Sequence, residues 1–136
     1  MRGGGLGRPD AGAAAVEMAL VLPLLLLLVF GIVDFGRALN LQITLTQAAR
    51  EGVRPAALRQ PASSVNQAVT NATAGMMAPA PSVSIITCPL GPGTATVTVS
   101  KTFQFVTPVG AVADLFGASA LGGNIAMSGR GAMRCS

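Results

Sequence analysis

Residues 12–34 read GAAAVEMALVLPLLLLLVFGIVD, in which Glu17 is the one charge ahead of Asp34. The run from Met18 to Val33 is uncharged, and the small residues before Glu17 extend it. Together they supply the roughly 20 helical residues that cross a hydrocarbon core of about 30 Å. We therefore expect a transmembrane helix over residues 13–34. Inserting a carboxylate at the bilayer centre costs about 2.5–3.5 kcal/mol. Glu17 lies only one turn inside the segment, where the cost is smaller, but a charge there still indicates a functional role.

The residues ahead of this helix form a basic, glycine-rich leader over residues 1–12. A cleaved secretory signal peptide is the alternative interpretation. It would need an apolar core of about 7–15 residues followed by an A-x-A-like site. In residues 34–39, DFGRAL, the one pair of small residues at that spacing is Gly36 and Ala38, not an A-x-A. We therefore favour a helix that stays in the membrane.

The composition argues against an enzyme. The chain has 136 residues, no His, Trp or Tyr, and only 10% charged residues. It contains no His–carboxylate pair, no metal-ligand cluster and no phosphate-binding loop. We therefore expect no catalytic residues, no metal and no cofactor. The net charge of +4 is scattered along the chain, so nucleic acid is not an expected partner.

The helix is predicted to continue beyond the membrane over residues 35–54. Leu41, Leu45 and Ala48 recur at helical spacing and define a face for packing. Pro55 disfavours helical geometry at the residue before it, so a stop at Arg54 is expected and the helix would be about 63 Å long. Pro23 removes a hydrogen bond inside the span and predicts a bend there.

Residues 55–136 have the pattern of one small α+β domain. A capping box at Ser64 and Gln67 predicts a short helix, whose apolar face includes Val65 and Val69. Period-two alternation then predicts three strands, near residues 83–87, 95–105 and 125–135. Lys101 interrupts the apolar face of the second strand and indicates an edge or an end position. A three-stranded antiparallel sheet packed on the projecting half of the long helix is the simplest architecture.

Cys88 and Cys135 each stand at the end of a predicted strand. A disulfide between them would close a loop of about 47 residues and contribute about 4 kcal/mol by the chain-entropy model. The alternative is a pair of free buried thiols. Because a disulfide needs an oxidising compartment, the bridge would place the domain outside the cytoplasm.

Three segments carry a family resemblance: residues 12–37, GAAAVEMALVLPLLLLLVFGIVDFGR; residues 47–54, QAAREGVR; and the closing Met133-Arg134. The chain resembles the TadE-like pseudopilins, most specifically over residues 12–59. The resemblance implies a pilin-like fold and a minor pseudopilin of the tight-adherence (Flp pilus) machinery. Ala11 and Met18, which flank the motif residues, differ from the residues common in that family.

The resemblance also implies how the chain is processed and where it resides. A prepilin peptidase would cut between Gly12 and Ala13, which makes Glu17 the fifth residue of the mature chain. The chemistry of the site gives Glu17 a role without the family: a carboxylate in lipid favours a cation, so we expect Glu17 to pair with the new amine of a neighbouring subunit and to set the register of the helix during assembly. Glu17 that simply reaches the lipid headgroups is the alternative. Expected partners are the peptidase, other pilin-like subunits, membrane components of the machinery and the lipid bilayer. The expected location is the bacterial cytoplasmic membrane, with a single pass and the C-terminal domain extracytoplasmic.

A second function class fits the same residues. The chain could be a single-pass anchored binding module whose extracytoplasmic domain meets a ligand without any pilus role. An N-terminus at Ala13 would favour the pseudopilin, and an intact Met1 would favour the module.

Overall fold

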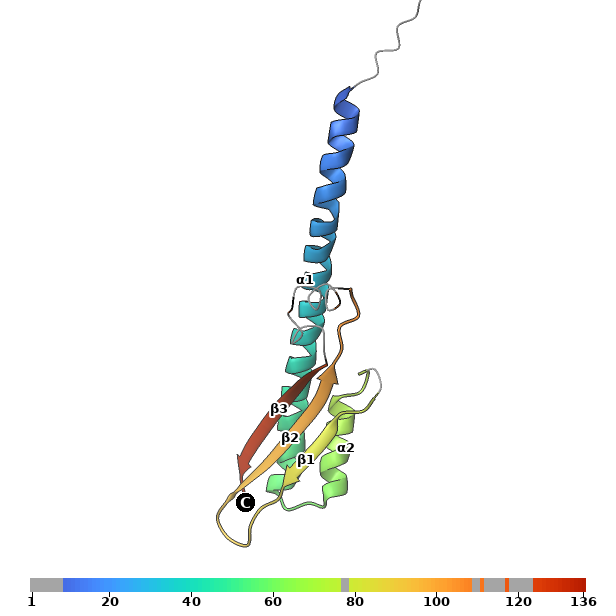
Figure 1. Cartoon of the computed structure of the whole chain (residues 1–136). Coiled ribbons are helices and arrows are strands. Elements are labelled where there is room, and N and C mark those ends of the chain that lie inside the picture. The colour runs from blue at the N-terminus through green and yellow to red at the C-terminus, as the bar shows by residue number, and fades with distance from the viewer. Residues whose placement is uncertain (1–8, 77–78, 109–110, 112–116, 118–123) are drawn as a thin grey trace, which may run out of the picture.

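A long helix carries a small domain on its C-terminal half (Figure 1). The computed structural model describes residues 9–76, 79–108, 111, 117 and 124–136. Helix α1 spans Pro9–Ala57 and helix α2 spans Ala62–Ala72. Strands β1 (Ser82–Ile86), β2 (Thr94–Phe103) and β3 (Ile125–Arg134) form an antiparallel sheet in the order β1-β2-β3. The predicted α+β fold, with a long helix, a short helix and three strands, is confirmed.

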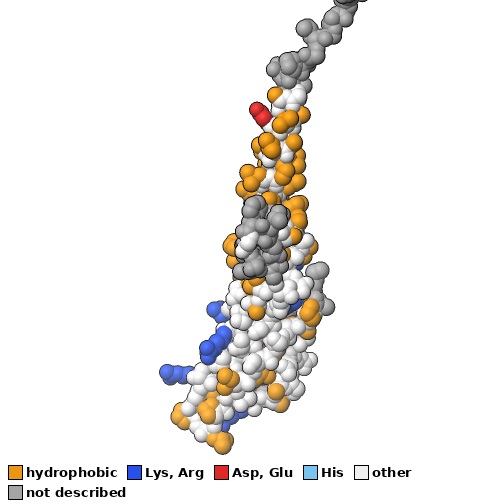
Figure 2. All heavy atoms as spheres, in the orientation of Figure 1, with side chains coloured by type: hydrophobic (Ala, Val, Ile, Leu, Met, Phe, Trp, Pro, Cys, Tyr) orange, Lys and Arg blue, Asp and Glu red, His pale blue; other side chains and the backbone are white. Residues whose placement is uncertain are grey.

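The N-terminal half of α1 projects away from the domain with its apolar side chains exposed (Figure 2). Among the described residues it is the one helix long and apolar enough to cross a membrane, and none of its most apolar window is buried in the structure. The helix continues through Pro23. The bend expected at that proline stays a prediction.

The C-terminal end of α1 differs from the predicted stop at Arg54, because the helix runs through Pro55 to Ala57. Arg59 adopts a left-handed conformation with φ of 56°. Its amide donates to the Ala56 carbonyl at 3.2 Å, and the Gln60 amide donates to the Pro55 carbonyl at 3.0 Å. This pair of bonds closes the helix as a Schellman motif. Proline loses one hydrogen bond there, but the burial of Ala56 and Ala57 in the core and the closing bonds retain the last turn.

The core of the domain lies between α1, α2 and one face of the sheet. Leu45 and Ala48 of α1 are fully buried, as their helical spacing predicts, and Ala49 beside them is also fully buried. They meet the inward-facing residues of β2 and the predicted apolar face of α2. These partners, all buried, are Ala95, Val97, Val99, Val65 and Val69.

Strand β3 packs directly against the backbone of α1. A Cβ placed on Gly129 would lie 2.3 Å from the backbone carbon of Leu45, and one on Gly131 would lie 2.4 Å from the Ala49 carbonyl oxygen. No side chain fits at either position, so glycine is required where the strand and helix touch. The Gln42 side chain adds a hydrogen bond of 3.0 Å to the Ser128 carbonyl.

The predicted capping box at Ser64 and Gln67 is wrong, because helix α2 begins before Ser64. The helix starts at Ala62 with Pro61 at the N-cap and no side-chain cap. Pro61 is extended, with φ of −62° and ψ of 153°, and its carbonyl accepts the Ser64 amide at 2.9 Å. Proline therefore sets the entry to the helix, and Ser64 lies within the first turn.

Of the two positions predicted for Lys101, an edge strand or the end of a strand, the structure shows the second. Strand β2 is the central strand, so the edge alternative is wrong. The pairing of β1 with β2 stops at Ser100, whereas β3 pairs with β2 as far as Phe103. Lys101 thus occurs just past the end of the neighbouring strand.

Cys88 and Cys135 form a disulfide, with their Cα atoms 5.9 Å apart. The bridge joins the segment after β1 to the last residues of the chain, next to the end of α1. The Ser136 amide donates to the Ala57 carbonyl at 3.3 Å. The disulfide and this bond hold the C-terminus at the end of the helix that lies farthest from the apolar half.

Substituting Gly129 by alanine is expected to destabilise the domain, because the new Cβ would overlap the helix backbone. Overpacking of this kind costs about 1–3 kcal/mol, and about 1 kcal/mol lowers the melting temperature of a domain this size by roughly 4–8 °C. Thermal unfolding of the detergent-solubilised chain, followed by circular dichroism, measures the shift. Ser128→Ala, on the exposed face of the same strand, is the control. Equal melting temperatures for the two variants would contradict the close approach.

Candidate functional site

The residues predicted to direct processing and assembly lie at the exposed N-terminal end of α1. Gly12, Ala13 and Glu17 are all solvent-exposed, and the Gly12–Ala13 bond lies inside the helix, which begins at Pro9. A side chain at Gly12 would meet no described atom within 4 Å, so packing among the described residues does not require glycine there. Arg2 and Arg8 of the predicted leader lie outside the described residues.

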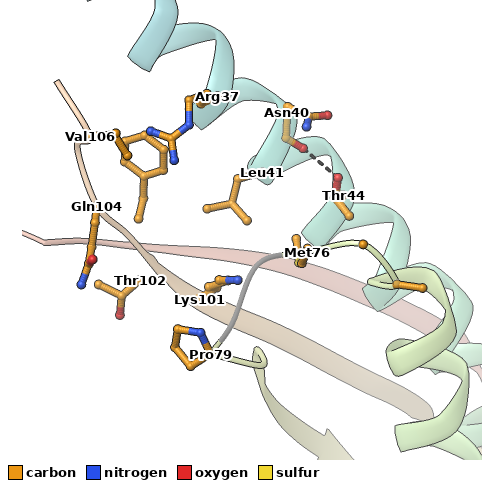
Figure 3. Close-up of a pocket in the computed structure, with 13 residues that line it drawn as sticks. Arg37, Asn40, Leu41, Thr44, Met76, Pro79, Lys101, Thr102, Gln104 and Val106 are labelled. Atoms are coloured by element: carbon orange, nitrogen blue, oxygen red, sulfur yellow. Dashed lines mark hydrogen bonds between the residues drawn. The ribbon is translucent and has the colours of Figure 1, made fainter.

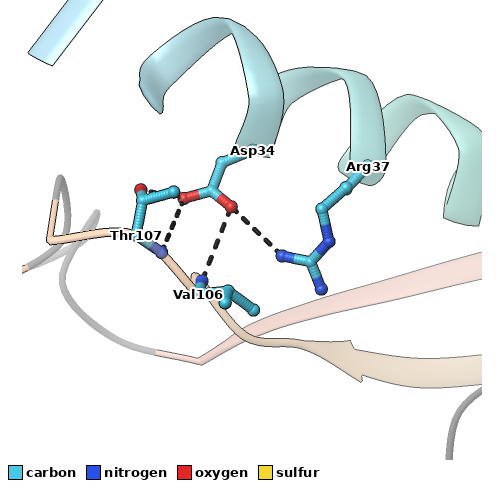
Figure 4. Close-up of polar contacts among 4 residues, drawn as sticks. All are labelled: Asp34, Arg37, Val106 and Thr107. Carbon is cyan, nitrogen blue, oxygen red and sulfur yellow. Dashed lines mark hydrogen bonds and ion pairs between the residues drawn. The ribbon is translucent and has the colours of Figure 1, made fainter. Parts of the chain in front are cut away.

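Asp34 is a buried charged residue with several hydrogen-bond partners. It lies where the apolar half of α1 ends, yet its residue is only 1% exposed. Its carboxylate accepts hydrogen bonds from the Val106 amide at 3.5 Å, from the Thr107 amide at 3.3 Å and from the Thr107 hydroxyl (Figure 4). Arg37, one turn along the helix, donates to the same carboxylate at 3.1 Å. Such charge-assisted bonds are the stronger ones in proteins.

The segment after β2 reaches Asp34 because it continues in the direction of the strand, toward the apolar half of α1 (Figure 1). Phe103 ends the strand in the core, and Phe105 packs edge-on against it with ring centroids 5.3 Å apart. The Arg37 guanidinium lies 5.5 Å from the centre of the Phe103 ring, within cation–π range. The ring, the carboxylate and the guanidinium therefore hold one another in place at the top of the domain.

An open groove of about 600 Å³ lies beside this cluster, between α1, the segment that follows α2 and the end of β2 (Figure 3). Arg37 from α1 and Lys101 from β2 both line it, and none of the described residues lining it is acidic. Its remaining polar lining consists of Asn40, Thr44, Thr102 and Gln104. Within the described part of the chain, no group of three His, Cys, Asp or Glu side chains could hold a metal ion.

Sequence reasoning placed Asp34 at a membrane interface but missed its partners. An acidic residue followed three positions later by Arg37 does indicate an intrahelical pair. The partners that bury it, Val106 and Thr107, lie 72 and 73 positions further along the chain. No local pattern links them to Asp34. The groove was missed for the same reason, because its lining comes from separate elements.

The fold and the exposed apolar half of α1 define a class of protein. It is a small α+β domain carried on a long helix whose N-terminal half is apolar enough to span a membrane. Comparison with protein families places this class more narrowly, because residues 12–54 match the family described as TadE-like protein. The match includes Gly12, Glu17 and the helix as far as Arg54, and it confirms the TadE-like resemblance of the chain. Comparisons with curated proteins and with solved structures give no match.

Replacing Asp34 by asparagine should loosen the segment after β2, because the variant loses the charge and one of the two acceptor oxygens that receive the Val106, Thr107 and Arg37 donors. Hydrogen bonds to charged groups contribute about 1.5–3 kcal/mol. We expect faster hydrogen exchange at the Val106 and Thr107 amides and a lower melting temperature. Hydrogen exchange with mass-spectrometric readout and thermal unfolding measure the two effects.

Glu51→Gln is the matched control for that substitution. Glu51 also pairs with an arginine three residues on, but the two atoms are 3.9 Å apart and both side chains are more than half exposed. Surface pairs of this kind contribute about 0–1 kcal/mol. An Asp34→Asn variant no less stable than Glu51→Gln would show that the cluster does not hold the segment.

Proposed function

We propose that this protein is a minor pseudopilin of the tight-adherence (Flp pilus) machinery, or of a related type IV pilus-like system. In this proposal the chain is inserted in the bacterial cytoplasmic membrane through the N-terminal half of α1, and its domain is extracytoplasmic. The observation that carries the proposal is the TadE-like match over residues 12–54, which falls on the one described helix that is long and apolar enough to cross a membrane. The Cys88–Cys135 disulfide supports an oxidising location for the domain.

A prepilin peptidase is the proposed processing partner, and Gly12–Ala13 the proposed cleavage site. Gly12 is helical although glycine destabilises a helix interior by about 1 kcal/mol relative to alanine. Space around it is open, so its small size serves no contact within the described chain. A peptidase must open a helical peptide bond to cut it, and glycine makes that opening easier. Cleavage would remove the leader and create an amine on Ala13.

Glu17 is the proposed register residue for assembly with other pilin-like subunits. It is exposed, and within the described residues it forms no hydrogen bond or ion pair. A carboxylate in the apolar segment of a membrane helix is stabilised when it finds a cation. The Ala13 amine of a neighbouring subunit would supply one, and the pairing would fix how far one helix lies along the other.

The first test is the mature N-terminus. In cells that contain the prepilin peptidase, the purified protein should begin at Ala13, and in cells without it at Met1. Gly12→Val should block cleavage, because a β-branched residue replaces the smallest one at the scissile bond. Gly31→Ala, at another open position of the same helix, should leave cleavage intact. Intact-mass spectrometry and N-terminal sequencing distinguish the products, and a chain that keeps Met1 beside an active peptidase would favour an anchored binding module.

The second test addresses Glu17. Glu17→Leu should leave membrane insertion unchanged, since it removes a charge from an apolar segment, but it should reduce co-purification with pilin-like subunits severalfold. Glu51→Leu removes an acidic side chain from the domain half of α1 and serves as the control. Quantitative mass spectrometry of affinity-purified complexes measures the association. Equal recovery of partners with Glu17→Leu and wild type would rule out the register role.

A further inference from the structure

The groove beside Arg37 combines two cations with a neutral polar lining. Arg37 approaches it from α1 and Lys101 from β2 (Figure 3), so the two charges come from elements that the core holds at a fixed separation. No carboxylate lies among the described residues that line it. A volume of about 600 Å³ is in the range of small-molecule sites. These features suit an anionic group carried on a molecule of moderate size.

Arg37 keeps donors for such a ligand although it pairs with Asp34. A guanidinium has five N–H donors, and the bond to Asp34 involves only Nη1. The Arg37 side chain is 41% exposed, so part of it faces solvent. Asp34 and the ring of Phe103 orient the guanidinium. The Arg37 side chain would therefore lose less conformational entropy when a ligand binds.

The position of the Arg37 end of the groove along α1 indicates the kind of anion. The apolar run of α1 ends at Val33, and Arg37 follows four residues later, about 6 Å along a helix. Each headgroup layer of a bilayer is roughly 5–8 Å thick beyond the hydrocarbon core. Arg37 therefore reaches the headgroup layer when the apolar half of α1 is in the membrane. Val106, which is 73% exposed and lines the same groove, offers an apolar contact there.

We propose that this groove binds the headgroup phosphate of an anionic phospholipid in the leaflet from which the domain emerges. Arg37 and Lys101, which both line the groove, provide the positive charge. The proposal rests on the proposed function only in that α1 is embedded in a bilayer. A soluble phosphate would meet the same cations, but it would gain nothing from the position of the groove in the headgroup layer.

Lipid binding can be measured on the full chain in detergent micelles. Native mass spectrometry would compare the retention of phosphatidylglycerol with that of phosphatidylcholine, added at equal concentrations. We expect the wild type to retain the anionic lipid preferentially. Lys101→Gln should weaken its binding about fivefold, the change that corresponds to about 1 kcal/mol per cation near an anionic surface.

Arg130→Gln is the matched control, since Arg130 is exposed on β3 and does not line the groove. Thermal unfolding of each variant verifies that the domain is folded. Equal retention of the two lipids by the wild type would overturn the proposal, as would equal binding by Lys101→Gln and Arg130→Gln.

A second measurement separates the lipid from a soluble anion. Inorganic phosphate, titrated against the same lipid-free protein, should bind far more weakly than phosphatidylglycerol. Equal affinity for both would assign the groove to a soluble phosphate and overturn the lipid source. Neither measurement depends on cleavage at Gly12 or on pilin-like partners, so the lipid site and the pseudopilin role can fail independently.

Discussion

The contact of β3 with the backbone of α1 is the constraint on which the rest of the structure depends. Gly129 lies against Leu45 and Gly131 against Ala49, so two residues of strand match four residues of helix. Two strand residues advance about 6.6–6.8 Å and four helical residues about 6 Å. The strand therefore runs along the helix in the same direction with almost equal spacing (Figure 1), and both can touch over more than one position.

That contact determines where the other elements lie. Strand β2 pairs with β3 along its whole length, which brings the apolar face of β2 onto Ala48 and Leu45 and leaves the end of β2 beside Arg37. The segment after β2 can then reach Asp34. At the opposite end, the disulfide and the bond from Ser136 join the C-terminus to the last turn of α1. The domain is thus attached to the helix at both ends.

The sequence predicts the parts of this structure that depend on local periodicity. Helical spacing identified Leu45 and Ala48 as core, alternation identified the three strands, and the positions of the cysteines at strand ends indicated their pairing. Tertiary contacts account for what local patterns did not show. Packing carried α1 past Pro55, and Pro61 displaced the predicted cap of α2. The alternation in β3 placed both of its buried glycines on one face, but not the helix backbone that makes glycine necessary there.

The glycines of α1 fall into two groups that the same geometry separates. A Cβ on Gly52 would lie 2.7 Å from the Val69 side chain, whereas one on Gly12, Gly31 or Gly36 would meet no described atom within 4 Å. Gly52 is therefore explained by the fold of the domain. The other three stand in or beside the exposed half of the helix, where glycine weakens the helix and no contact of the described chain offsets the loss. The described contacts therefore do not require glycine at these three positions. In the proposed membrane setting, a peptidase at Gly12 and close-packed neighbouring helices at Gly31 and Gly36 would be surroundings in which a missing side chain is useful.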